Sequence, residues 1–174
     1  MSIQASILNV CESDIEALTR AEGLRDVIAQ VKSGQVRAIR DKYGPQKGRN
    51  SNSMWGRIKG AVTRRERLYE VLFKQEFGED ESRFFAFFTR EQRATKKRVP
   101  EEETLWAFRL VVQAIPHMQA DIQAERTKLC YSDTSGGFSD EIWQDKWQGQ
   151  NNMEIWRALG KENYGLHKAS KKTP

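Results

Sequence analysis

Apolar residues recur at three- and four-residue steps along most of the chain, and almost no stretch alternates apolar and polar residues as a half-buried strand does. The first such stripe extends from Ile15 to Val31. Ser13 and Glu16 stand before it at the spacing of a capping box, so we expect a helix that begins there. Gly34 loosens or ends this helix.

A shorter helix is expected next, with Val36, Ile39 and Tyr43 along one side, and Gly44-Pro45 stops it. Residues 44–53 then have the glycine, proline, asparagine and serine content of a mobile loop.

The following pattern predicts a helix from about Met54 to Phe77, with Gly78 as its C-cap. Its apolar side comprises Trp55, Ile58, Val62, Tyr69, Leu72 and Phe73. Basic residues lie roughly opposite, namely Arg57, Arg64, Arg67 and Lys74, and Lys59 and Arg65 flank them.

A fourth helix is predicted over residues 82–95, entered through three acidic residues that suit a helix N-terminus. Four aromatic rings surround Ala86 in it, so more than one side is apolar: Phe84, Phe85, Phe87 and Phe88. A helix buried on two sides is the first interpretation. An oligomer contact or a groove for a partner is the second, and stacking of these rings on single-stranded bases is a third.

Pro100 and the glutamates after it predict the start of the most hydrophobic helix, which we assign to the centre of the core. Pro116 should kink or divide this helix. A serine- and glycine-rich loop follows from Ser132, and Ser139 then caps a short helix. We expect the three tryptophans of the last two helices to anchor them to the core, with a partner surface as second choice.

The predicted fold is therefore all-α: a single compact helical domain of about six to seven helices, with a flexible basic loop and a frayed C-terminal tail. The domain covers residues 1–160 and includes a C-terminal helical subdomain at 139–160, and residues 161–174 form a flexible basic tail. A chain of 174 residues is long enough to bury one proper core.

Charge is strongly segregated along the chain. The net charge is +5, but residues 32–67 alone hold 11 basic and 2 acidic residues, or +9, between blocks of −3 and −4. A second basic block, 83–99, has a charge of +5. Such a concentration is typical of a surface that meets a polyanion, although an ordinary solvated surface is the alternative.

These blocks predict a nucleic-acid-binding regulatory protein, whether for RNA or DNA. Arginine is common in them, and its planar guanidinium can grip a phosphate with two hydrogen bonds. The expected phosphate contacts are Arg37, Arg40, Lys42, Lys47, Arg49, Arg57, Lys59, Arg64, Arg65, Arg67, Lys96, Lys97 and Arg98.

Catalysis is not expected. There is no glycine-rich phosphate cradle and no metalloprotease motif, and the two histidines, His117 and His167, stand far apart in the sequence. Cys11 and Cys130 lack the spacing of a zinc site or a disulfide framework. We predict no catalytic residue, no metal and no cofactor.

A second class remains open: a protein-interaction or assembly module, such as a small viral or phage structural or regulatory protein. It would bind itself or an acidic protein partner, with Phe84, Phe85, Phe87 and Phe88 as the contact. Homo-oligomers fit either class. No segment approaches the length of a membrane span and the first residues do not resemble a secretory signal, so the expected compartment is the cytoplasm, or the nucleus if the protein is eukaryotic or viral.

Overall fold

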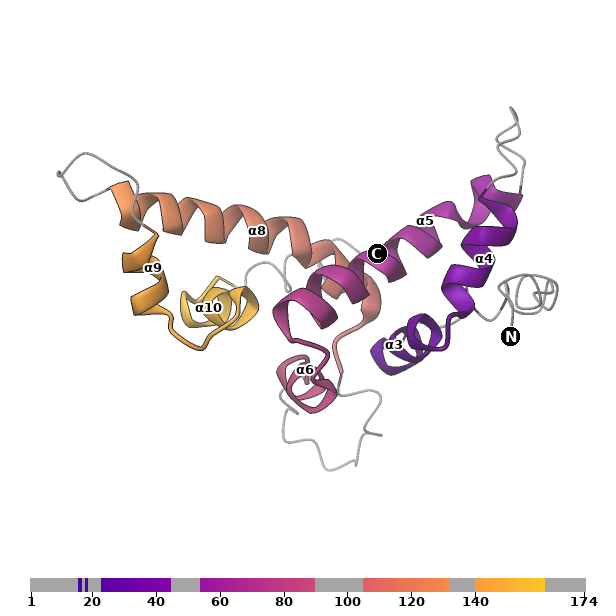
Figure 1. Ribbon diagram of the computed structural model, residues 1–174, viewed down its shortest axis with the longest axis horizontal. Coiled ribbons are helices and arrows are strands. Elements are labelled where there is room, and N and C mark those ends of the chain that lie inside the picture. The colour runs from indigo at the N-terminus through magenta and orange to yellow at the C-terminus, as the bar shows by residue number, and fades with distance from the viewer. Residues whose placement is uncertain are drawn as a thin grey trace, which may run out of the picture. The chain divides into compact units, whose positions relative to one another are not determined.

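The computed structural model describes residues 16, 18, 23–44, 54–89, 105–131 and 140–161, and every regular element in these ranges is helical (Figure 1). Pairing between extended segments there is limited to one isolated antiparallel bridge, between Thr89 and Leu105. The all-α fold is thus confirmed. No helix in the described ranges is long and apolar enough to cross a membrane.

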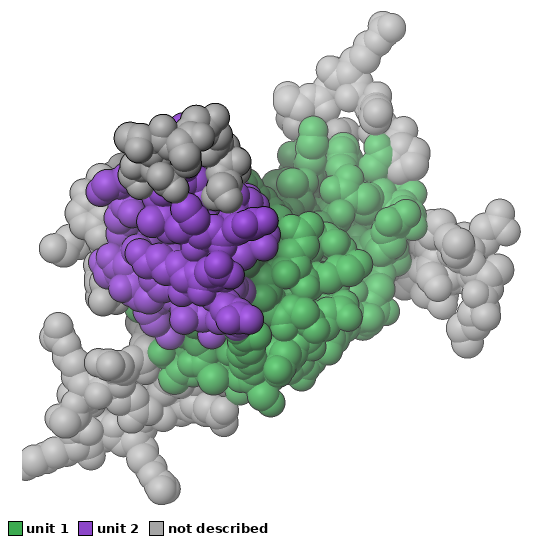
Figure 2. Space-filling model, turned by 60° about the vertical axis from the view of Figure 1, so that its left-hand side comes forward, with its two compact units in different colours: residues 1–109 green, residues 110–174 purple. Residues whose placement is uncertain are grey.

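The chain separates into two compact units, Met1–Arg109 and Leu110–Pro174, which Figure 2 shows in green and purple. Each is described by itself below. The single domain over residues 1–160 stays a prediction.

The first helices of unit 1 are α3 (Leu24–Lys32) and α4 (Gln35–Tyr43). Leu18 is also helical, but Gly23 lies in a bend, so the continuous helix expected from Ser13 to Val31 is wrong at this point. Ser13 itself lies outside the described residues. Gly34 does separate the two helices, because it adopts φ +81°, a left-handed conformation that glycine reaches without a steric cost.

The next helical segment has the predicted length, but it changes from an α-helix to a π-helix along its course. Helix α5 (Met54–Arg67) continues directly into a π-helix, η1 (Leu68–Glu76), in which backbone hydrogen bonds span five residues. The Phe77 N–H, for example, donates to the Leu72 carbonyl at 3.0 Å. The C-cap is Phe77, and Gly78, which was predicted to be the C-cap, follows it at φ +59° and ends the helix.

Helix α6 (Glu81–Phe87) begins at Asp80, whose carboxylate accepts a hydrogen bond from the Arg83 N–H at 3.1 Å. It is shorter than the predicted 82–95 helix. Thr89 pairs with Leu105 instead, and the Phe88 carbonyl accepts a hydrogen bond from the Trp106 N–H at 2.8 Å.

The four phenylalanines of this segment are all buried, so the structure does not present them as a contact surface for a partner or an oligomer. The Phe84 ring meets Phe73 and Phe77 edge to face, with centroids 5.3 Å apart in each pair. The remaining rings of the cluster are Phe85, Phe87 and Phe88. The first interpretation, a helix buried on more than one side, is the one that the structure shows.

A second apolar cluster joins α4 to α5 and consists of Leu18, Val36, Ile39, Ile58, Ala61 and Val62. Because α5 buries only the side with Ile58 and Val62, its opposite side faces solvent.

Helix α8 (Phe108–Tyr131) begins eight residues after Pro100, and Trp106 and Ala107 just before it are not helical, so the helix start predicted at Pro100 is wrong. The helix continues through Pro116 without division. Pro116 is exposed, but the carbonyl that it leaves without its usual backbone donor is that of Val112, a buried residue.

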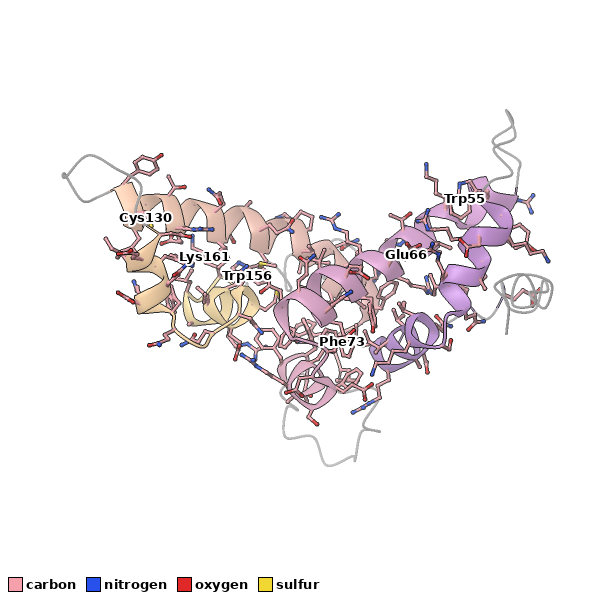
Figure 3. The ribbon with its side chains drawn as sticks, in the orientation of Figure 1. Trp55, Glu66, Phe73, Cys130, Trp156 and Lys161 are labelled. Atoms are coloured by element: carbon pink, nitrogen blue, oxygen red, sulfur yellow. The ribbon has the colours of Figure 1, made fainter. Side chains whose placement is uncertain are left out.

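Unit 2 also contains α9 (Glu141–Lys146) and α10 (Asn152–Ala158). Asp140, rather than the predicted Ser139, is the N-cap residue of α9, and its carboxylate accepts two hydrogen bonds from Arg126 of α8. The buried Trp156 donates its indole N–H to Asp121 at 2.8 Å, which fastens α10 to α8 (Figure 3). Asn151 and Glu154 form a capping box at the start of α10.

Candidate nucleic-acid interface

The exposed side of α5 carries a line of basic residues. Arg57, Gly60, Arg64 and Arg67 follow one another at steps of three, four and three residues, which brings them to the same side of a helix. Lys59 is also exposed. We call Arg57, Lys59, Arg64 and Arg67 the basic face.

Gly60 gives the basic face a gap in which a side chain can lie close to the helix. A Cβ atom built at Gly60 would be 3.1 Å from Nη1 of Arg64, so the Arg64 guanidinium lies over this glycine. The Arg64 guanidinium thus lies against the helix backbone at Gly60.

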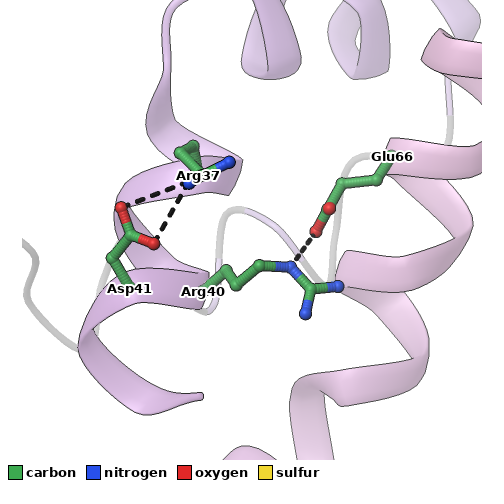
Figure 4. A network of polar contacts seen from close by, with 4 residues as sticks. All are labelled: Arg37, Arg40, Asp41 and Glu66. Atoms are coloured by element: carbon green, nitrogen blue, oxygen red, sulfur yellow. Dashed lines mark hydrogen bonds and ion pairs between the residues drawn. The ribbon is translucent and has the colours of Figure 1, made fainter. Parts of the chain in front are cut away.

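Within the described ranges, the side chains of the four members of the basic face form no ion pair or hydrogen bond with another residue. The basic residues of α4 differ. Nε of Arg37 is 3.1 Å from Oδ1 of Asp41, and Nε of Arg40 is 2.6 Å from Oε1 of Glu66 (Figure 4). The positive charge of α5 is therefore less compensated than that of α4.

Three predicted contacts on α4 thus have local partners. Arg37 remains open to solvent, with 77% of its side chain exposed despite its pairing with Asp41. Arg40 is half-buried between Glu66 and the ring of Trp55. The Lys42 ammonium lies over the ring of Tyr43.

Arg65 was predicted to contact phosphate, and the structure contradicts this placement because only 3% of the residue is exposed. Its guanidinium donates to the carbonyls of Leu18 and Ala61 and to Oε1 of Gln30, and it lies over the ring of Phe108 at 5.1 Å. Arg65 is part of the core of unit 1.

The environment of Arg65 disfavours its charge. Burial, with a smaller contribution from the neighbouring charge of Arg64, lowers the pKa of Arg65 to about 10. The guanidinium thus remains charged at neutral pH, at a cost in folding free energy.

Five predicted contacts lie outside the described residues, which leaves them as predictions: Lys47, Arg49, Lys96, Lys97 and Arg98.

The structure adds two aromatic residues that the sequence did not point to. Trp55 and Tyr43 are half-buried, and the Arg40 guanidinium and the Lys42 ammonium lie 5.3 Å from their respective ring centroids. The sequence could have indicated them, because each aromatic residue is close in sequence to basic residues of α4 or α5.

Acidic residues gather instead around η1 and α6. The exposed acidic residues there are Glu70, Glu79, Asp80 and Glu81. The acidic residue of α5, Glu66, is half-buried. Unit 1 thus has a basic part at α4 and α5 and an acidic part at η1 and α6, in keeping with the charge blocks of the sequence.

Unit 2 contains an open hollow of about 470 Å³ next to Trp143 and Trp147, with amide side chains such as Gln148 along its wall. The sequence did not predict it. No group of three or more histidine, cysteine, aspartate or glutamate residues able to hold a metal occurs in the part of the chain that the structure describes. The described cysteine, Cys130, is a buried free thiol.

Comparison with models of known families, with curated proteins and with solved structures gives no match to this chain. The fold and the basic face together define the chain only as a helical protein with a segregated cationic surface.

Proposed function

We propose that this chain is a non-catalytic nucleic-acid-binding protein in which the basic face of α5 contacts phosphates. The observation that carries the proposal is the set of four exposed cations along one helix, none of which is paired with another described residue.

The dimensions of the basic face suit a phosphate backbone. Arg57 and Arg67 are ten residues apart, which corresponds to about 15 Å along an α-helix. One nucleic-acid strand advances roughly 3.4 Å per phosphate in a duplex, so the basic face spans about four nucleotides.

Electrostatics favours the same ligand. Like charges at neighbouring positions of a helix repel each other, and Arg64 and Arg67 are separated by a single turn. Phosphates between these guanidinium groups would convert the repulsion into charge-assisted hydrogen bonds.

The alternative, an assembly module that uses aromatic contacts, has less support because Phe84, Phe85, Phe87 and Phe88 are buried within unit 1. An acidic protein partner would use the same basic face, and it becomes the leading candidate if nucleic acid fails to bind.

The proposal is tested by fluorescence anisotropy with short single- and double-stranded RNA and DNA at two salt concentrations. The informative variant is R57A/R64A/R67A, which omits the buried Arg65. At ~0.1 M salt each lost phosphate contact lowers affinity by up to about eightfold, so the triple variant should lose on the order of 10²-fold. The slope of log K against log salt should fall by about 2 to 3.

The matched control is K128A/K146A/R157A, which removes three exposed cations from unit 2 and lowers the net charge equally. It should bind nearly as well as the parent chain. Equal losses in both variants would show that only net charge matters, and no binding of any nucleic acid at low salt would refute the proposed function. Far-UV circular dichroism of each variant confirms that it is folded.

A further inference from the structure

Helix α5 has a single acidic residue, Glu66, and every other charged residue of this helix is arginine or lysine. Glu66 follows Lys59 by seven residues, or two turns, so it lies on the same side of α5 as this member of the basic face. It is half-buried, whereas Lys59 is exposed. A free carboxylate at this edge of the basic face would repel the phosphates that the basic face is proposed to bind.

A residue of α4 neutralises this carboxylate. Nε of Arg40 donates a hydrogen bond to Oε1 of Glu66 at 2.6 Å (Figure 4). The two side chains are only 35% and 33% exposed, so solvent and salt screen the ion pair less than they screen a fully exposed one. The Arg40 guanidinium also lies 5.3 Å from the ring centroid of Trp55, in the first turn of α5. The ion pair and the ring thus hold the guanidinium against α5.

Arg37, the other arginine of α4, is paired differently. Its Nε is 3.1 Å from Oδ1 of Asp41, one turn along α4 itself, and 77% of the Arg37 side chain is exposed. This pair compensates charge within α4, whereas the Arg40 pair joins α4 to α5. Arg37 and Asp41 therefore provide a matched comparison, an arginine–carboxylate pair in which the carboxylate does not belong to α5.

From these contacts we infer that Arg40 is a positioning residue of the basic face and not a phosphate contact. It holds and neutralises Glu66, so that α5 presents its four exposed cations without an uncompensated carboxylate beside them. The inference rests on the proposed function and assigns a role within the same site. Because Arg40 acts through Glu66, it becomes dispensable for binding once Glu66 has lost its charge.

The test measures the affinity of three variants for the same labelled RNA and DNA ligands at ~0.01 M salt, where the screening length is about 30 Å. R40M frees the Glu66 carboxylate and should weaken binding by about 2- to 5-fold. E66Q removes this charge, nearly keeps the side-chain shape and should strengthen binding by about the same factor. R40M/E66Q lacks both charges and should bind as tightly as the parent chain.

The double variant separates the two roles of Arg40. If the guanidinium contacted a phosphate, R40M/E66Q would stay weaker than the parent chain by on the order of tenfold at this salt concentration, and the inference would be overturned. An unchanged affinity of E66Q would also contradict it, because Glu66 would then have no influence on the ligand. Both results leave the proposed function standing, which is refuted separately if the parent chain binds none of the ligands.

R37M is the matched control. It also removes one positive charge and leaves a carboxylate, that of Asp41, without its arginine, but this carboxylate belongs to α4. It should therefore weaken binding less than R40M, and equal losses in the two variants would show that the position of Glu66 has no importance. Far-UV circular dichroism confirms that each variant is folded. E66Q keeps Arg40, so its affinity tests the inference even if R40M does not fold.

Discussion

Replacement of the buried Arg65 should reverse the usual ranking of conservative substitutions. The Arg65 guanidinium reaches three neutral acceptors, on Leu18, Gln30 and Ala61. In R65K, a lysine ammonium retains the buried charge but can reach about one of these acceptors. Two hydrogen bonds to a charged group at about 1.5 kcal/mol each give a loss of roughly 3 kcal/mol in the free energy of unfolding.

R65M should be less harmful, although methionine is chemically more distant from arginine. It loses the hydrogen bonds but also removes the cost of burying a charge. The lowering of the Arg65 pKa to about 10 corresponds to roughly 3 kcal/mol for that cost. The net loss for R65M is therefore about 1 to 2 kcal/mol.

Urea denaturation followed by circular dichroism measures these differences, and hydrogen exchange of α3 and α5 assigns them to unit 1. The controls are R64K and R64M, which alter the exposed neighbour and should change stability by less than about 0.5 kcal/mol. If R65K proves as stable as the parent chain, or less damaging than R65M, the reasoning about a buried and specifically bonded guanidinium is refuted.

The pH dependence gives an independent check of Arg65. The pKa of Arg65 in the folded chain, about 10, is below its ordinary value, so the unfolded chain binds more protons between the two values. Below pH 10 the cost of the buried charge is present in full, and stability is regained as the pH rises above about 10 and the folded chain releases this proton. The stability of the parent chain relative to R65M should therefore increase over this interval, since the other titrating groups are common to both and cancel in the difference.

Three further substitutions test the local structure. G34A should destabilise the chain by about 1 kcal/mol in urea denaturation, because Gly34 has φ +81° and a Cβ there would meet nothing within 4 Å, which leaves backbone strain as the cause; an unchanged midpoint would contradict this. N151A removes the cap of α10 and should cost about 1 kcal/mol, with faster hydrogen exchange at the amide of Glu154, and equal exchange rates would argue against the capping box. W156F removes the hydrogen bond to Asp121 and should lower the free energy of unfolding by about 1 to 2 kcal/mol. The control W106F should lower it less, because Trp106 is only half-buried. A smaller loss in W156F than in W106F would show that this hydrogen bond does not hold α10 to α8.

The sequence predicted those features that depend on local spacing. Glycines at 34 and 78 mark real helix ends, since a left-handed backbone there favours the residue without a Cβ. The apolar side of α5 also follows directly from the positions of Ile58 and Val62. These features could be predicted because neighbours along one helix determine them.

Arg65 was misassigned although the spacing contained the answer. It follows Ile58 by seven residues, Ala61 by four and Val62 by three, which places it on the buried side of α5. Arg65 was grouped with Arg64 and Arg67 because the three are close in sequence, although the helical spacing places Arg65 on a different side of α5. Its acceptors on Leu18 and Gln30, however, are brought close only by tertiary packing and could not be predicted.

The phenylalanines and Pro116 show a different limit. Whether Phe84 and Phe88 face a partner or the core depends on Phe73 and Phe77, whose positions relative to α6 are set by the turn at Gly78. Pro116 is exposed and stays within α8, although its residue type predicted a kink or a division of the helix. The position of the Arg40 guanidinium over the Trp55 ring likewise depends on how α4 packs against α5.

The contacts that residues 105–108 make within unit 1 affect the order in which this protein can fold during its synthesis. Leu105 pairs with Thr89, Trp106 bonds to Phe88, and the ring of Phe108 covers the Arg65 guanidinium. A nascent chain that ends at residue 89 lacks all three contacts, and at about 5–20 residues per second the ribosome needs roughly one to four seconds to add them. We therefore expect the first helices to remain loosely packed, with the Arg65 guanidinium not yet covered by Phe108. Unit 1 should reach its final packing only after residue 108 has been added.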